Sequence, residues 1–127
     1  MKKRTVEVIE ELTTQLEHLS QPIHLLAVCG GGKRIAEMSE EFLKKKGIEA
    51  KHFEVWVDSV KGEASIAKTN FTKEDYIGTA VIVDDVIWSG HLLPPIKQML
   101  TEMEPTKKFY LASLLDCNEK ADFSVFK

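Results

Sequence analysis

The sequence predicts an α/β fold, with helices on both faces of a mostly parallel central sheet. Apolar runs typical of buried strands occur at residues 23–28, 79–83 and 109–115. Apolar residues recur at helical spacing in 3–19 and 33–46, before and after the first of these runs. Strands that alternate with helices along a chain usually pair in parallel, and the connecting helices then lie on the faces of the sheet.

Turn-forming residues, and the alternation of apolar with polar residues, predict the other helices and strands. Pro22 closes the first helical region, and Gly47 follows the second as a C-terminal cap. The remaining predicted elements are a strand with alternating polarity at 51–58, a mobile loop or short hairpin at 59–78, a helix from near Leu93 or Pro94 to about Met103, and a short last strand at 121–126.

Composition excludes several classes of protein. The chain has 127 residues, 43% of them hydrophobic and 29% charged, which predicts one globular domain over residues 1–127. A net charge of -3 argues against nucleic-acid binding. No apolar run reaches the ~18 residues of a membrane helix, and the start is not typical of a signal peptide. Two widely separated cysteines, Cys29 and Cys117, fit free thiols in a cytoplasmic protein.

The segment with the most specific chemistry runs from Ala80 to Gly90. Four apolar residues precede the adjacent carboxylates of Asp84 and Asp85, and a Ser89-Gly90 turn follows them. Ligands of open α/β sheets bind beyond the carboxyl ends of the strands. Two neighbouring carboxylates favour a cationic or hydroxyl-rich ligand, and amides at a turn before a helix can hold a phosphate. A pair of aspartates that only caps a turn is the alternative.

This segment resembles the PRPP-binding motif of the type I phosphoribosyltransferases, and the resemblance extends over residues 23–126. It implies that Asp84 and Asp85 bind the ribose hydroxyls of PRPP and, through PRPP, a Mg²⁺ ion. It also implies a loop around the 5′-phosphate made of Val86, Ile87, Trp88, Ser89, Gly90 and His91.

A second part of the resemblance is the glycine-rich turn after the first strand. It implies a pyrophosphate loop made of Cys29, Gly30, Gly31, Gly32 and Lys33, because glycines let a backbone approach a ligand closely. Cys29 stands where the family has a basic residue, so Lys33 or Arg34 would have to supply the positive charge. Solvated helix residues are the alternative for both.

Residues 58–78 correspond to the flexible loop that closes over the substrate in this family. Lids of this kind exclude water from reactive intermediates. Ser59, Lys61 and Lys68 are the candidates to reach the site. A surface hairpin without any contact to the ligand is the alternative for each of them.

The sequence departs from the family pattern at several positions. Trp88 replaces a catalytic Asp of many purine enzymes, and Leu92 replaces a Thr that donates to the phosphate. Pro94 and Pro95 delay the start of the following helix, which leaves a longer phosphate loop. Cys117 stands where the purine enzymes have a base-binding Lys. The chain also begins near the first core helix and ends at Lys127, so we expect the base-binding hood to be lacking.

Three functions therefore stay open. The first is a glycosyltransferase of nucleotide metabolism that transfers phosphoribose from PRPP to a base and releases pyrophosphate, with Mg²⁺ as cofactor. The second is a non-catalytic module that senses PRPP or a nucleoside 5′-phosphate, and the third is a structural protein that keeps only the fold. The expected partner is a small molecule, and a homodimer is left open. The sequence does not name the acceptor base.

Overall fold

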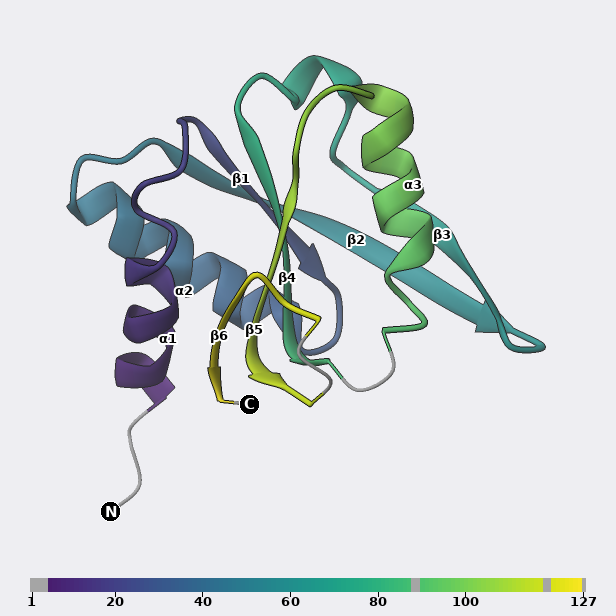
Figure 1. Cartoon of the computed structure of the whole chain (residues 1–127), viewed down its shortest axis with the longest axis horizontal. Helices are drawn as coiled ribbons and strands as arrows, with labels where there is room; N and C mark the ends of the chain where they lie inside the picture. The colour runs from purple at the N-terminus through teal and green to yellow at the C-terminus, as the bar shows by residue number, and fades with distance from the viewer. Residues whose placement is uncertain (1–4, 88–89, 118–119, 127) are drawn as a thin grey trace.

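The computed structural model describes residues 5–87, 90–117 and 120–126. Its core is one six-stranded sheet in the order β3-β2-β1-β4-β5-β6 (Figure 1). The elements are α1 (Thr5–Thr14), β1 (Ile23–Val28), α2 (Gly32–Lys45), β2 (Ala50–Val60), β3 (Glu63–Thr69), a 3-10 turn η1 (Lys73–Asp75), β4 (Thr79–Ile87), α3 (Pro94–Met103), β5 (Tyr110–Asp116) and β6 (Phe123–Phe126).

The sheet is mostly parallel, as the sequence predicts. β1 pairs in parallel with β2 and with β4, β4 pairs in parallel with β5, and β5 with β6. Only β3 runs antiparallel, because it forms a hairpin with β2. The carboxyl ends of the parallel strands therefore meet at one edge of the sheet, where open α/β sheets bind ligands.

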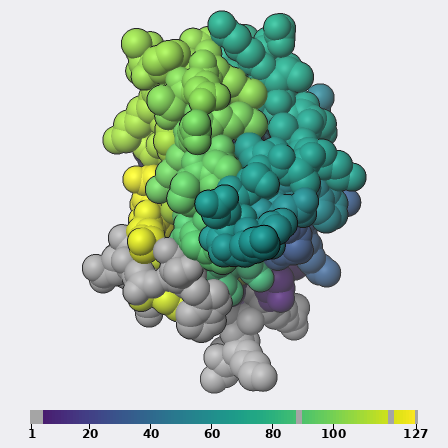
Figure 2. Space-filling model, turned by 90° about the vertical axis from the view of Figure 1, so that its right-hand side faces the viewer, coloured from purple at the N-terminus to yellow at the C-terminus, as the bar shows by residue number. Residues whose placement is uncertain are grey.

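Helices cover both faces, which confirms the predicted fold class. α1 and α2 lie on one face and α3 lies on the other (Figure 1). The sheet therefore has a hydrophobic core on each face, and successive residues of β1 point into different cores. Leu25 packs in the core beneath α1 and α2, and Leu26 packs in the core beneath α3. Figure 2 shows α3 and the β2–β3 hairpin side by side on the second face, where α3 contacts β3. No helix in the described part of the chain has the length and apolar character to span a membrane.

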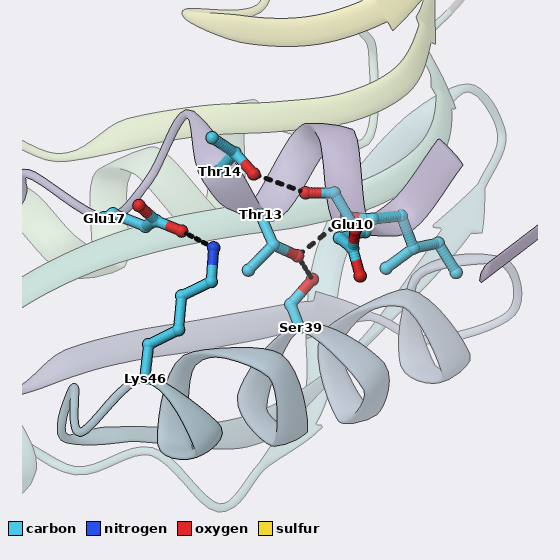
Figure 3. A network of polar contacts seen from close by, with 7 residues as sticks. Glu10, Thr13, Thr14, Glu17, Ser39 and Lys46 are labelled. Atoms are coloured by element: carbon cyan, nitrogen blue, oxygen red, sulfur yellow. Dashed lines mark hydrogen bonds and ion pairs between the residues drawn. The ribbon is translucent and has the colours of Figure 1, made fainter. Parts of the chain in front are cut away.

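Polar contacts join α1 to α2 around the first core (Figure 3). The hydroxyl of Thr13 donates to the carbonyl of Ile9 at 2.7 Å and lies 3.1 Å from the hydroxyl of Ser39 on α2, with which it also forms a hydrogen bond. Both hydroxyl side chains are buried, and the contact gives the Ser39 hydroxyl a hydrogen-bond partner inside the core. Near the other end of α2, Lys46 forms an ion pair with Glu17.

Several predicted boundaries need correction. The first helix stops at Thr14 instead of continuing to residue 19, and hydrogen-bonded turns follow it. Residues 59–78 form the end of β2, the strand β3 and the turn η1. Of the two predicted structures for this segment, a mobile loop or a hairpin, the hairpin is therefore the one that forms. β4 continues to Ile87, so Asp84 and Asp85 lie within the strand. The start of α3 at Pro94 agrees with the prediction from the two prolines.

A buried histidine lies in the second core at the amino edge of the sheet. The Nε2 atom of His24 accepts a hydrogen bond from the backbone N–H of Gly78 at 2.9 Å, which requires that this nitrogen carries no proton. The rings of Phe53, Phe71 and Tyr76 surround the imidazole. Burial is the main cause that lowers the pKa of His24. The charge of Lys107 lowers it further, and that of Asp75 opposes the shift.

We predict that His24 makes stability fall as the medium becomes acidic. The unfolded state takes up the proton first, because the pKa of His24 is lower in the folded state. Its contribution is therefore complete above the unfolded value of about 6.5 and is lost as the pH falls below it. Urea unfolding of wild type and His24→Gln at pH 7.5 and 5.5 measures the effect. The stability of the variant relative to wild type should rise at pH 5.5, and an unchanged difference would contradict the prediction.

Candidate functional site

The predicted site residues of β1 and β4 meet at the carboxyl edge of the sheet. β1 and β4 are adjacent and parallel, and Ala27 lies opposite Val83. The turn after β1 is therefore beside Asp84 and Asp85. This juxtaposition is the one expected for a shared ligand site, and it could be predicted from strand order alone.

The glycine turn packs directly against β4, at Val83 and Asp85. A Cβ on Gly31 would lie 2.1 Å from Cγ of Asp85, and a Cβ on Gly32 would lie 2.2 Å from the carbonyl oxygen of Val83. Gly30, by contrast, has a φ of +115°, and nothing lies within 4 Å of the place that its Cβ would occupy, so its conformation is what requires glycine. Gly31 and Gly32 thus allow the turn to pack closely on β4, and of the three glycines only Gly30 faces open space.

Each of the two aspartate carboxyl groups accepts a hydrogen bond from the backbone N–H of the next residue. Oδ1 of Asp84 accepts the N–H of Asp85 at 2.8 Å, and Oδ1 of Asp85 accepts the N–H of Val86 at 2.8 Å. Burial is the main cause that raises the pKa of Asp84 to about 7. The carboxyl of Asp85 also raises it through a hydrogen bond and its charge, against the opposing effect of the Asp85 N–H. A carboxyl group with such a pKa both donates and accepts hydrogen bonds near neutral pH.

A depression separates Asp84 from the start of α3. Its lining residues are Asp84, Val86, Ile87, Gly90, His91, Leu92 and Leu93. Gly90 has a φ of +74°, and its carbonyl accepts the N–H of Leu93 at 3.1 Å, which turns the chain into the helix. Four residues of the predicted phosphate loop therefore line this depression: Val86, Ile87, Gly90 and His91. Trp88 and Ser89 lie outside the described residues.

An acidic residue that no sequence motif marks lies at the glycine turn. Nζ of Lys33 is 3.3 Å from Oε1 of Glu54 on β2, and Sγ of Cys29 is 3.8 Å from the same oxygen. Burial is the main cause that raises the pKa of the Cys29 thiol, and the charge of Glu54 adds to it. The ion pair with Glu54 thus partly neutralises the positive charge expected of Lys33. Only the pairing of β1 with β2 brings these residues together.

Solved structures with a similar fold are purine phosphoribosyltransferases. A hypoxanthine-guanine phosphoribosyltransferase from Bacillus anthracis superposes with a TM-score of 0.77 at 22% identity, over 95% of this chain and 75% of that one. A purine phosphoribosyltransferase from Pyrococcus horikoshii gives 0.77 at 22%, over 94% and 80%. The L. donovani hypoxanthine-guanine enzyme gives 0.72 at 18%, over 97% and 74%.

The chain has the type I phosphoribosyltransferase fold. No family model matches its sequence, and no curated protein is significantly similar to it. The likeness is therefore one of architecture, and it agrees with the fold expected from the residues around Asp84 and Asp85.

In this phosphoribosyltransferase fold, the β2–β3 hairpin reaches past the carboxyl edge. β2 pairs with β1 only as far as Val55, and its last residues pair with β3 alone. Ser59 and Lys61 are exposed near the tip, and Nζ of Lys68 lies 5.1 Å from the centre of the Trp56 ring. Among the described residues, none of these three candidates forms an ion pair or hydrogen bond with the aspartates. Their role at the site stays a prediction.

The described residues contain no cluster of three or more His, Cys, Asp or Glu side chains that could hold a metal ion by themselves. Asp84 and Asp85 offer two neighbouring carboxyl groups. Mg²⁺ in phosphate-binding proteins is commonly held by one or two carboxylates together with phosphate oxygens of the substrate and water. The carboxyl groups of Asp84 and Asp85 therefore fit a metal ion that arrives with a phosphorylated ligand.

We predict that Gly31→Ala destabilises the fold by about 1–3 kcal/mol, because the new methyl group must displace the Asp85 carboxyl. Asp85→Ala should relieve most of this cost in the double variant, as a double-mutant cycle of urea unfolding would measure. Gly32→Ala is the matched control: its methyl group would meet the backbone at Val83, which Asp85→Ala does not remove. Equal coupling of Asp85→Ala to both glycine substitutions would contradict the assigned contact.

We predict that Asp84→Asn stabilises the protein at alkaline pH. The folded-state pKa of about 7 lies above the ordinary value near 3.9, so ionisation of Asp84 opposes folding as the pH rises through this window. With allowance for solvent screening, the free energy of unfolding at pH 8 should increase by about 2 kcal/mol.

Urea unfolding at pH 8 and pH 5 tests this prediction, with Glu63→Gln on the exposed hairpin as the control. The advantage of Asp84→Asn should shrink at pH 5, where the wild-type carboxyl is mostly protonated in the folded state. A gain that is the same at both pH values would show that burial of the charge is not its cause.

Proposed function

We propose that the carboxyl edge of the sheet binds a phosphoribosyl compound, PRPP or a nucleoside 5′-phosphate, and that the protein transfers phosphoribose to a base with release of pyrophosphate. The observation that carries the proposal is the packing of the Asp84–Asp85 pair against the glycine turn of β1. The purine phosphoribosyltransferases of the same architecture support it.

Asp84 and Asp85 would hold the ribose. Carboxyl oxygens accept hydrogen bonds from neighbouring sugar hydroxyls, and bonds to a charged acceptor are stronger than neutral ones. Asp84 combines partial burial with a pKa of about 7, which is the kind of perturbation that gathers at functional sites. The strand fixes both side chains in advance, so the ligand is positioned without reorganisation of the backbone.

The glycine turn would accommodate the pyrophosphate group. Gly30 faces open space, so a ligand can approach its backbone closely. Lys33 is half exposed beside Glu54 and would turn its charge toward the ligand. Asp84 and Asp85 would hold a Mg²⁺ ion indirectly, through the bound PRPP. Such an ion would supply charge neutralisation to the phosphate groups.

A sensor without transfer chemistry is the second candidate. The ion pair between Lys33 and Glu54 favours it, because it reduces the positive charge available to pyrophosphate. Under this alternative the same edge would bind a nucleotide and leave it unchanged. A cytoplasmic location is part of this proposal, and the free thiols of Cys29 and Cys117 support it. A homodimer stays a prediction.

Asp84→Asn combined with Asp85→Asn should weaken PRPP binding at least a hundredfold, since two charge-assisted bonds of about 1.5–3 kcal/mol each are lost. Calorimetry with PRPP and Mg²⁺ measures the affinity. Glu10→Gln combined with Glu74→Gln removes the same charge from exposed positions elsewhere and should leave the affinity unchanged. Equal affinities of wild type and the Asp84/Asp85 variant would refute the assigned role.

A pyrophosphate-release assay with PRPP, Mg²⁺ and a panel of bases separates the two candidates. Release that depends on a base supports the transferase. Binding of PRPP without release supports the sensor, and absence of binding contradicts both.

A further inference from the structure

The first turn of α3 has few amides to offer to a phosphate. Its first two residues, Pro94 and Pro95, carry no N–H. The next amide, that of Ile96, donates to the carbonyl of Leu93 at 3.0 Å, and the N–H of Leu93 donates to the carbonyl of Gly90. A helix N-terminus normally attracts anions through such amides. Here they are absent or already engaged, so an anion in the depression beside Asp84 needs another source of positive charge.

Lys120 lies over the turn at the other side of this depression. Its Cδ atom is 3.3 Å and its Cε atom 3.9 Å from the place that a Cβ on Gly90 would occupy. The aliphatic part of Lys120 thus packs on the backbone of a residue that lines the depression. The residue is exposed, and its ammonium group has no ion-pair partner among the residues that the structure describes.

A buried carboxylate fixes the position of this lysine. Asp116, at the end of β5, is 1% exposed and accepts the N–H of Lys120 and the N–H of Ala121, each at 2.8 Å. The N–H of Cys117 donates to the carbonyl of Ile87 at 3.0 Å, which joins the end of β5 to the end of β4. The backbone at Lys120 is therefore tied to the same sheet edge as the depression.

The other charged groups at the carboxyl edge of the sheet do not favour a phosphate, which makes the charge of Lys120 important. Asp84 and Asp85 bring two carboxyl groups, and the charge of Lys33 is shared with Glu54. A phosphate monoester carries close to two negative charges at neutral pH and would be repelled by the aspartates. The ammonium of Lys120 has no ion-pair partner among the described residues, and its flexible stem lets it reach over Gly90 and offset that repulsion.

We propose that Lys120 binds the 5′-phosphate of the ligand, in place of the amides that α3 does not supply. Glycine is needed at position 90 because it allows the positive φ of the turn and leaves room for the lysine stem. Asp116 acts as a positioning residue that holds the loop. The proposal rests on the proposed function, because it assumes a phosphoribosyl ligand on Asp84 and Asp85.

The test compares binding of GMP and guanosine by calorimetry at low and moderate salt. Lys120→Gln should weaken GMP binding about tenfold to a hundredfold and leave guanosine binding unchanged, since only GMP carries the phosphate. Lys120→Arg should retain most of the GMP affinity. Lys73→Gln, which removes the same charge at the amino edge, is the matched control. Thermal unfolding verifies that each variant is folded.

The outcomes separate this inference from the proposed function. Equal GMP affinity of wild type and Lys120→Gln, with loss of binding in the Asp84→Asn, Asp85→Asn variant, would overturn the role of Lys120 and leave the ribose site standing. Equal losses for GMP and guanosine in Lys120→Gln would also overturn it, because they indicate a structural effect. Failure of wild type to bind GMP, guanosine and PRPP would overturn both proposals.

Discussion

The close approach between the turn after β1 and residues Val83 and Asp85 of β4 is the constraint on which the rest of the site depends. Gly31 touches the carboxyl of Asp85 and Gly32 touches the backbone at Val83, and α2 begins at Gly32. This contact fixes where the helix starts and which space remains in front of Gly30. The approach of Gly31 also limits where the Asp85 carboxyl can move. A side chain at position 31 would displace the Asp85 carboxyl, and one at position 32 would collide with the backbone at Val83.

The same edge concentrates groups that are unfavourable for stability. Asp84 is half-buried beside a second carboxyl group, and its raised pKa reflects the cost of its charge. The depression next to it has mostly apolar walls, which add to that cost. Stability alone would favour neutral residues here. Residues that lower stability and converge on one edge of a sheet are typical of a binding or catalytic site.

Two lysine side chains bring positive charge to the two ends of this sheet edge. At the glycine turn, Lys33 is paired with Glu54. At the depression, prolines remove amides from the first turn of α3, and Lys120 lies across Gly90. Both cations are side chains, which can move, whereas backbone amides are fixed by the fold. An anion at this edge would therefore be held by mobile charges, and its affinity should depend strongly on salt.

The sequence by itself determined every strand except β3, the glycine turn, the adjacent aspartates and the late start of α3, because each depends on local patterns of apolar residues, glycine or proline. Its prediction for residues 59–78 remained open between loop and hairpin, since their polar composition has no clear period. The sequence did not predict that Glu54 and Lys120 lie beside this edge, because nothing near them in the chain indicates it. Only the tertiary structure decided these points: pairing of β2 with β1 brings Glu54 to Lys33, and the buried Asp116 holds Lys120 beside Gly90.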